Sequence, residues 1–358
     1  MIPLAIVSDA RYEGGAERYV LRLGSGLDRR NWRPIVLLPD RRVLDGLARR
    51  LADSDVETVR WRRRPGLLGA FELARAINRL GPRLIHLNMP SPYEMGCGGW
   101  ASLLQRPARG LVTTEHIADI VASRRRVAQK RLWGGLIDRT ITISRAHAAL
   151  LTGRHGVHPD RIRVVYNGVE DPGTPMSKPV RPLRVAVVGS LEPRKGQAGF
   201  LRAARAAISG GVDLEVVLVG EGPDRESLSR QAMEGVLAGR VRMTGALESA
   251  APEIAAAHIV AVPSLIEGLP FVVAEAMAAG AVPLVSDLPG LDEVVDDSVG
   301  RLLPPDNEEA WTRALLELAG DHETLGRLAK AARARFLERL TRKRMIDGTT
   351  AVYGEVLA

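Results

Sequence analysis

Short apolar runs alternate along the chain with longer segments in which apolar residues recur every three or four positions. The short runs have the length and composition of buried parallel strands, and the longer segments, such as residues 15–27 and 72–80, have helical spacing. We expect strands at residues 4–7, 34–38, 84–87, 110–114, 140–143, 185–188, 214–219, 241–244, 259–262 and 282–285. Alternation of this kind predicts parallel sheets covered by helices on both faces.

The alternation is interrupted once, by the proline-rich segment DPGTPMSKPVRP at residues 171–182. Proline restricts the backbone and removes a donor, so this composition is typical of a linker. The 358 residues are enough for about two domains of ordinary size. We expect one domain at residues 1–170, a second at 171–339, and a last helix at about 340–358 that packs back on the first. Each domain would be a doubly wound α/β sheet of the Rossmann type, which binds ligands at the carboxyl ends of its strands.

The composition excludes several classes of protein. The 4% of aromatic residues argues against a base-stacking platform for single-stranded nucleic acid. The single cysteine, Cys97, excludes a disulfide framework and a cysteine-based zinc site, and it fits a reducing compartment. The first apolar run has no basic residues before it, and no apolar stretch reaches ~20 residues, so we expect a cytoplasmic chain without a signal peptide or a membrane-spanning helix.

The net charge of +8 is unevenly distributed. Residues 1–170 hold 29 Lys and Arg against 16 Asp and Glu, whereas residues 171–358 hold 21 against 26. Two basic clusters that contain tryptophan lie in the first half, at residues 60–64 (RWRRR) and 124–133 (RRRVAQKRLW). Arginine with tryptophan suits an anionic membrane surface, where the protein would be peripheral, and an ordinary solvated surface is the alternative. No nucleic-acid recognition module accompanies the charge, so we expect no nucleic-acid partner.

One segment has a chemical pattern that a plain helix does not require. At residues 263–280 (PSLIEGLPFVVAEAMAAG) a strand runs into a Gly-Leu-Pro turn and then an alanine-rich helix. The start of such a helix offers backbone N–H groups to an anion or a sugar hydroxyl. Glu267 and Glu275 bracket the turn, and carboxylates accept hydrogen bonds from sugar and ribose hydroxyls. The segment therefore predicts a sugar or nucleotide site.

Three other turns of the second half also follow strands, at residues 188–196 (VGSLEPRKG), 219–223 (VGEGP) and 244–247 (TGAL). Arg194 and Lys195 combine a planar fork with a compact charge, which suits a diphosphate. The glycines of the second turn lack a third glycine and precede a proline, which argues against a nicotinamide dinucleotide site.

Two motifs of the first half follow strands in the same way. Gly14 and Gly15 open a helix, and two glycines let the backbone approach a phosphate or an acceptor closely. His116 ends the strand-like run TTEH. A single histidine is more often structural, so its interpretation depends on the other motifs.

Together these motifs resemble the large family of retaining glycosyltransferases that includes sucrose, glycogen and lipopolysaccharide sugar transferases (family four, with the GT-B fold). The resemblance extends along nearly the whole chain and includes a hinge-like segment at residues 164–170. It implies two Rossmann-like domains that face each other across a cleft and close over a nucleotide sugar. Ser190 departs from the family pattern, which usually has arginine there, and Arg194 is a candidate replacement.

The resemblance also implies roles for individual residues. Glu267 would hold the hydroxyls of the donor sugar and Glu275 the ribose. His116 would contact the donor sugar beside the reacting carbon, while Arg194 and Lys195 would hold the leaving diphosphate. The other positions implied in donor binding are Gly14, Gly15, Ser190, Gly220, Gly222, Gly245, Ala246, Leu247, Gly268, Leu269, Pro270 and Phe271.

The expected function is transfer of a sugar, with retention of configuration, from a UDP- or GDP-sugar to an acceptor hydroxyl. The acceptor would be a carbohydrate, a lipid-linked molecule or a small molecule, in polysaccharide, lipopolysaccharide, glycolipid or natural-product synthesis. We expect no cofactor besides this donor and no metal, because the acidic triplet at residues 53–55 (DSD) lies in a polar turn far from any phosphate loop. A nucleotide-sugar epimerase and a non-enzymatic nucleotide-sugar-binding protein remain as alternatives.

Overall fold

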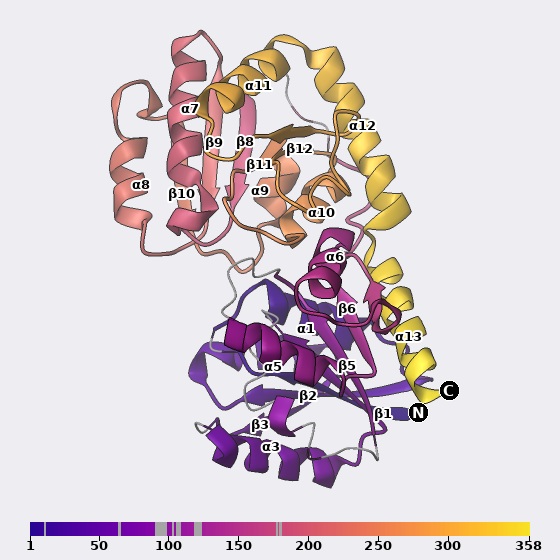
Figure 1. Ribbon diagram of the computed structural model, residues 1–358. Helices are drawn as coiled ribbons and strands as arrows, with labels where there is room; N and C mark the ends of the chain where they lie inside the picture. Colours follow the sequence, from indigo (N-terminus) through magenta and orange to yellow (C-terminus); the bar gives the residue numbers. More distant parts are fainter. Residues whose placement is uncertain are drawn as a thin grey trace. The chain divides into compact units, whose positions relative to one another are not determined.

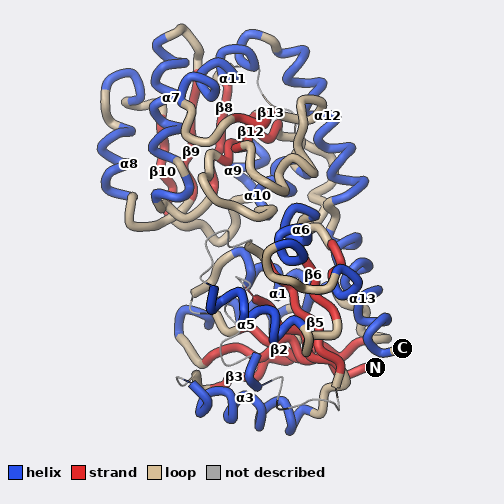
Figure 2. Tube along the Cα trace, in the orientation of Figure 1, coloured by secondary structure: helices blue, strands red, loops and turns tan. Residues whose placement is uncertain are grey.

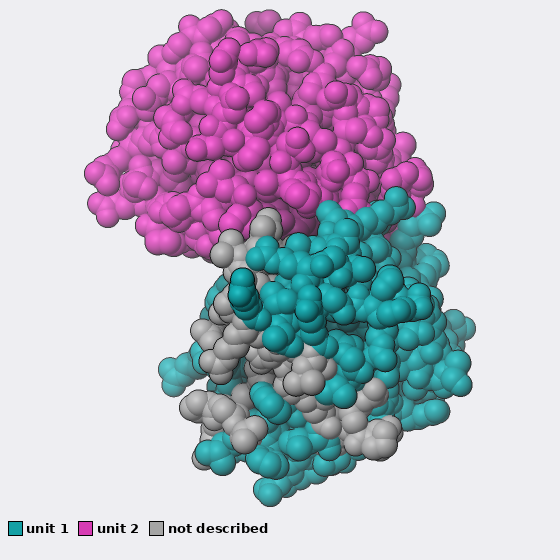
Figure 3. Space-filling view, in the orientation of Figure 1, with its two compact units in different colours: residues 1–167, 342–358 teal, residues 168–341 magenta. Residues whose placement is uncertain are grey.

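The chain divides into two compact units. A computed structural model describes residues 1–10, 12–63, 66–89, 99–101, 104, 109–117, 124–176, 178 and 181–358. Unit 1 comprises residues 1–167 and 342–358, and unit 2 comprises residues 168–341 (Figure 3). The chain thus returns to unit 1 for its last helix, α13 (Arg342–Leu357).

Unit 1 contains a parallel sheet with the strand order β3-β2-β1-β4-β5-β6-β7 (Figures 1 and 2). Its strands are β1 (Ile2–Ser8), β2 (Trp32–Pro39), β3 (Glu57–Trp61), β4 (Leu84–Met89), β5 (Gly110–Glu115), β6 (Arg139–Thr142) and β7 (Ile162–Val164). Its helices, besides α13, are α1 (Gly15–Gly26), η1 (Arg42–Leu44), α2 (Asp45–Asp53), α3 (Gly66–Leu80), α5 (Arg124–Gly134), α6 (Arg145–Gly153) and η2 (Pro159–Arg161). The strand order reverses between β1 and β4, which is where doubly wound sheets bind ligands.

Unit 2 repeats this plan with the order β10-β9-β8-β11-β12-β13, and all its strand pairs are parallel. The strands are β8 (Leu183–Val188), β9 (Leu214–Val219), β10 (Val241–Gly245), β11 (Ile259–Val262), β12 (Val282–Ser286) and β13 (Arg301–Leu303). The helices are η3 (Pro193–Lys195), α7 (Gln197–Ser209), α8 (Arg225–Ala232), η4 (Gly235–Leu237), α9 (Ala251–Ala256), α10 (Phe271–Ala278), α11 (Glu308–Gly320) and α12 (His322–Arg339). Here the order reverses between β8 and β11.

The expectation of a doubly wound α/β sheet in each half is confirmed, but three strands were missed: β3, β7 and β13. All three lie at sheet edges and are short and partly exposed. An edge strand has one unpaired side and needs no continuous apolar run, so hydrophobic periodicity does not reveal it.

The predicted basic surface clusters need correction. Trp61 is only 4% exposed, and Arg60 donates hydrogen bonds of 2.8 Å to Asp45 and to the Arg41 carbonyl. Lys130 is 1% exposed and forms an ion pair with Glu115. The interpretation of these tryptophan and lysine side chains as a membrane-facing surface is therefore wrong, because both are buried. Arg64 and the side chains of Arg125, Arg126 and Trp133 lie outside the described residues.

Within the parts of the chain that the structure describes, no helix has both the length and the apolar character needed to cross a bilayer.

The loops at the carboxyl ends of the unit 2 strands are held together by their backbones. The Gly189 N–H donates to the Val219 carbonyl over 2.9 Å, and the Gly220 N–H donates to the Gly245 carbonyl over 2.9 Å. On the other side, the Leu265 N–H donates to the Arg194 carbonyl over 2.8 Å. The loops after β8, β9, β10 and β11 thus form one connected edge.

Gly196 makes one of the two closest of these contacts. Its φ is 70°, and a Cβ placed on it would lie 1.9 Å from the Pro263 carbonyl oxygen. Glycine is required here both by the left-handed backbone and by the contact between two loops.

We predict that Gly196→Ala lowers the free energy of unfolding by at least about 3 kcal/mol, because the clash adds to the ~1–2 kcal/mol of left-handed strain. Gly211→Ala is the matched control, since Gly211 has a φ of 96° and nothing within 4 Å of the added Cβ. It should show the backbone cost alone. Urea unfolding measures both, and equal losses would contradict the packing argument.

Three of the four buried histidines of unit 1 have a lowered pKa. Burial lowers the pKa of His86 and of His116 to about 3, with a smaller contribution from a neighbouring histidine in each case. Burial also lowers the pKa of His147 to about 4, although the Glu115 carboxylate acts in the opposite direction. All three imidazoles are therefore neutral in the folded protein at ordinary pH.

Acidification should destabilise the fold between about pH 6.5 and pH 3. In this window the unfolded chain binds protons that the folded chain excludes, so stability is complete above the ordinary histidine pKa and is lost as the pH falls. At pH 5 each such histidine costs about 2 kcal/mol. Urea unfolding should show that His147→Leu loses less free energy of unfolding than the wild type when the pH falls from 7 to 5. The control is His158→Leu, because the His158 side chain is 68% exposed, and its loss should match that of the wild type. Stability independent of pH over this range would refute the prediction.

Candidate functional site

The candidate site of unit 2 centres on an ion pair. Lys195, in η3 after β8, donates through Nζ to Oε1 of Glu267, in the loop after β11. The Ser264 Oγ donates to the same oxygen over 2.8 Å. The Lys195 and Glu267 side chains are 18% and 7% exposed. Two of the predicted residues, 72 positions apart, therefore meet at the sheet's switch point, and Ser264 is a third member that sequence reasoning did not single out.

Arg194 has a different partner from its neighbour. Its Nε donates to Oε2 of Glu192 over 2.9 Å. Hydrogen bonds from Ser190 and from Arg194 lower the pKa of the Glu192 carboxyl despite its partial burial. The predicted residues Ser190 and Arg194 thus converge on a carboxylate that the sequence analysis missed. The buried Gln197 holds the same loop by donating to the Ser190 carbonyl over 2.8 Å.

The turn after Glu267 keeps two of its side chains buried. Leu269 and Phe271 are buried, so contacts of these two residues with a ligand would use backbone atoms. Helix α10 begins at Phe271 with Pro270 as its N-cap, and no side chain caps it. Glu275 lies half-buried in this helix.

The glycines of the neighbouring loops have a packing role. A Cβ on Gly220 would lie 1.9 Å from the Gly189 carbonyl oxygen, and a Cβ on Gly222 would lie 2.3 Å from that of Leu191. Gly245 has a φ of 75° and little space beside Glu221. These three glycines are thus explained by contacts between loops, without reference to a ligand. Ala246 and Leu247, which follow them, are exposed.

The candidate site of unit 1 includes Gly14 and Gly15, at the start of α1. The Gly14 N–H donates to Oε2 of the buried Glu17 over 3.0 Å, and the Ser8 Oγ donates to Oε1 over 3.2 Å. Neither glycine has a positive φ, and a Cβ on Gly15 would meet nothing within 4 Å. The described fold does not itself require glycine here, so these positions suit close approach of a ligand.

His116 is connected to this glycine turn through Asn88. The Asn88 side chain donates through Nδ2 to the Ala16 carbonyl over 3.0 Å, and its Oδ1 lies 2.7 Å from His116 Nε2. With Asn88 oriented in this way, the neutral His116 carries its proton on Nε2, and Nδ1 has a lone pair. Asn88 was missed, although a polar residue at the carboxyl end of a buried strand is the signal that would have indicated it.

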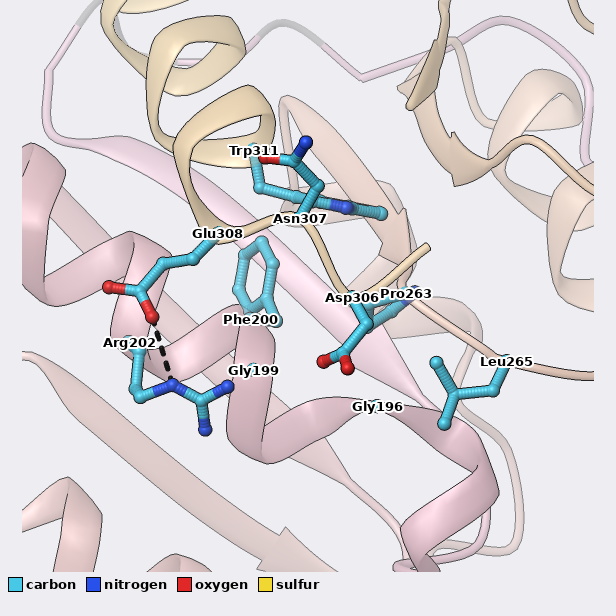
Figure 4. A pocket seen from close by; sticks show the side chains of 10 residues that line it. All are labelled: Gly196, Gly199, Phe200, Arg202, Pro263, Leu265, Asp306, Asn307, Glu308 and Trp311. Atoms are coloured by element: carbon cyan, nitrogen blue, oxygen red, sulfur yellow. Dashed lines mark hydrogen bonds and ion pairs between the residues drawn. The ribbon is translucent and has the colours of Figure 1, made fainter. Parts of the chain in front are cut away.

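A separate hollow with a volume of about 20 Å³ lies between the starts of α7 and α11 (Figure 4). The rings of Phe200 and Trp311 meet there with centroids 5.9 Å apart, and Arg202 donates to Glu308 over 2.9 Å at one side. This volume is far below the ~300–1,000 Å³ usual for ligand pockets, and neither Lys195 nor Glu267 lines the hollow. It is therefore not the predicted donor site.

Among the described residues, no three His, Cys, Asp or Glu side chains converge in a way that could hold a metal ion.

Two family profiles match the chain, one in each half. Residues 13–171 match the profile described as Glycosyltransferase Family 4, and residues 182–321 match the profile described as Glycosyl transferases group 1.

Curated relatives carry related names. The chain is 28% identical over 247 residues to the MMP alpha-(1->4)-mannosyltransferase of Mycolicibacterium hassiacum, covering 66% of this chain and 57% of that protein. It is 36% identical over 146 residues to the phosphatidyl-myo-inositol mannosyltransferase of Mycolicibacterium smegmatis, covering 39% and 37%. It is 29% identical over 341 residues to the D-inositol 3-phosphate glycosyltransferase of Salinispora tropica, covering 82% and 69%. The match thus spans less than two thirds of the length of each of the first two relatives.

Solved structures share the fold over the full chain. Anabaena HepE in complex with UDP-glucose has a TM-score of 0.83 at 19% identity and covers 99% of this chain and 100% of that one. The lipopolysaccharide outer core galactosyltransferase WaaB has a TM-score of 0.74 at 14% identity, with 99% of both chains covered. With both halves matched by the family profiles and the fold shared throughout, the chain belongs to the family-four-like glycosyltransferases of the GT-B fold.

Proposed function

We propose that the protein transfers a sugar, with retention of configuration, from a UDP- or GDP-sugar to an acceptor hydroxyl. The observation that carries the proposal is the Lys195–Glu267 pair with Ser264, at the switch point of the unit 2 sheet. A cation for a diphosphate lies there beside a carboxylate for sugar hydroxyls. The names of the relatives and the UDP-glucose bound to HepE support the same class of donor.

Lys195 and Glu267 would act in sequence. Without donor, Glu267 holds Lys195 at the edge of the sheet. A diphosphate carries more negative charge than one carboxylate, so it would draw Lys195 and free Glu267 for the hydroxyls of the sugar. Ser264 would keep Glu267 in place during this exchange. Arg194, 38% exposed and bound to Glu192, would add a second cation by changing partners.

In the chemical step, the bond between the sugar and the diphosphate breaks first. Negative charge develops on the phosphate oxygens, where Lys195, Arg194 and the start of α10 would stabilise it. The acceptor hydroxyl then forms the new bond from the same face of the sugar, and a phosphate oxygen takes its proton. Glu267 would bind hydroxyls and form no covalent intermediate.

His116 would contribute a neutral acceptor. With its proton on Nε2 bound to Asn88, its Nδ1 can accept a hydrogen bond from a hydroxyl of the donor sugar. Its low pKa keeps this lone pair available at physiological pH. We therefore assign His116 a role in turnover, and assign nucleotide binding to unit 2.

For the acceptor, we propose a polyol or glycolipid hydroxyl near an anionic group, bound by unit 1. Two observations support this: the excess of basic residues in the first half of the chain, and relatives whose names specify inositol phosphate or phosphatidylinositol. An anionic membrane surface on the cytoplasmic side would offer the same chemistry to a peripheral protein.

The test is to incubate the protein with a panel of UDP- and GDP-sugars, with inositol phosphate or phosphatidylinositol vesicles as acceptors, in excess chelator. We expect transfer from one donor, and proton NMR of the fresh product should show the donor's anomeric configuration. Donor alone should give only slow hydrolysis. Formation of a new nucleotide sugar from donor alone would indicate an epimerase. Donor binding without transfer would indicate a binding protein. A product with inverted configuration would contradict retention.

A further inference from the structure

A chain of buried hydrogen bonds in unit 1 begins and ends on the carboxyl-terminal helix α13. Its members are Tyr353, His86, Thr114, Tyr19 and Thr349, all at most 1% exposed. Tyr353 and Thr349 lie on α13, His86 on β4, Thr114 on β5 and Tyr19 on α1. These hydrogen bonds thus join α13 to β5, the strand that ends beside His116.

Three of these four bonds are 2.8 to 3.4 Å long. His86 Nε2 lies 2.8 Å from Thr114 Oγ1, which lies 3.2 Å from the Tyr19 hydroxyl. The Tyr19 hydroxyl lies 3.4 Å from Thr349 Oγ1, and His86 Nδ1 is bonded to the Tyr353 hydroxyl.

One arrangement of protons satisfies every bond. Thr349 donates its only hydroxyl proton to the Met345 carbonyl over 2.8 Å, so it must accept from Tyr19. Tyr19 in turn accepts from Thr114, and Thr114 accepts from Nε2–H of the neutral His86. Nδ1 of His86 is then left to accept from Tyr353. Each hydroxyl has a fixed direction, so the network orders its members as a unit.

This network contacts His116 directly. The ring of Tyr19 meets the His116 ring edge-on, with centroids 4.9 Å apart and planes at 69°. Thr114 is two residues before His116, at the end of β5. Helix α1, which carries Tyr19, also supplies the Ala16 carbonyl that holds Asn88, the hydrogen-bond partner of His116.

We propose that α13 helps to position an active-site residue: Thr349 and Tyr353 fix the position of Tyr19, and Tyr19 fixes the ring of His116. Tyr19, Thr349 and Tyr353 are positioning residues for this histidine. The proposal rests on the role in turnover assigned above to His116. The competing interpretation is that the network only attaches α13 to the sheet.

The first test is Tyr19→Phe, which keeps the ring and removes the hydroxyl. We expect kcat to fall about tenfold with the donor KM unchanged, because a loosely held histidine affects the reaction and not nucleotide binding. Thr349→Val should also lower kcat. Thr349→Ser, which retains the hydroxyl, should keep kcat near that of the wild type.

Thr113→Val is the matched control. Its hydroxyl is also buried on β5 and lies 3.3 Å from the Thr140 hydroxyl, outside the network. Thr113→Val should lower stability without lowering kcat. In a double-mutant cycle, Tyr19→Phe should have no further effect on kcat once His116→Ala is present. Equal factors in both backgrounds, or a similar loss from Thr113→Val, would overturn the proposal.

A readout without donor separates this proposal from the proposed function. In imidazole proton–nitrogen NMR spectra, Tyr19→Phe and Thr349→Val should shift the His116 signals, and Thr113→Val should leave them unchanged. Unshifted His116 signals would overturn the positioning role whether or not the protein transfers a sugar. Absence of transfer by the wild type, with shifted signals in both variants, would contradict only the proposed function.

Discussion

The ion pair between Lys195 and Glu267 is the interaction on which the proposed donor site of unit 2 depends. Both side chains are largely removed from water, so each charge needs the other, and loss of one partner from a buried pair costs about 3–5 kcal/mol. Gly196, the residue after Lys195, lets the loop after β8 lie against the Pro263 carbonyl. The loops, their glycines and the start of α10 are thus arranged around two opposite charges.

In unit 1, by contrast, the candidate site residue His116 is kept uncharged. Burial holds the pKa of His116 at about 3, and Asn88 determines which ring nitrogen carries the proton. This difference suits the proposed division of labour. In this proposal, charged groups in unit 2 would bind a charged nucleotide, and a neutral hydrogen-bond acceptor in unit 1 would bind sugar hydroxyls. The buried network extends this role to α13, the last helix of the chain.

The sequence predicted the parts of this account that depend on local pattern. The Gly-Leu-Pro turn between Glu267 and Glu275, and Lys195 after a strand, are visible as short motifs. The bond between His86 and Tyr353 is not, because its partners are 267 positions apart and meet only in the folded unit. The Arg–Trp cluster was misinterpreted because the same residues appear whether Trp61 points outward or is buried, as it is here.

The most direct test of the central claim is calorimetry on Glu267→Gln with the free nucleoside diphosphate and with the matching nucleotide sugar. If Glu267 competes with the diphosphate for Lys195 and then binds the sugar, the variant should bind the free diphosphate at least as tightly as the wild type. It should bind the nucleotide sugar about tenfold or more weakly, as expected when a hydrogen bond to a charged group is lost. Equal weakening of both ligands, or an unchanged affinity for the nucleotide sugar, would contradict the account.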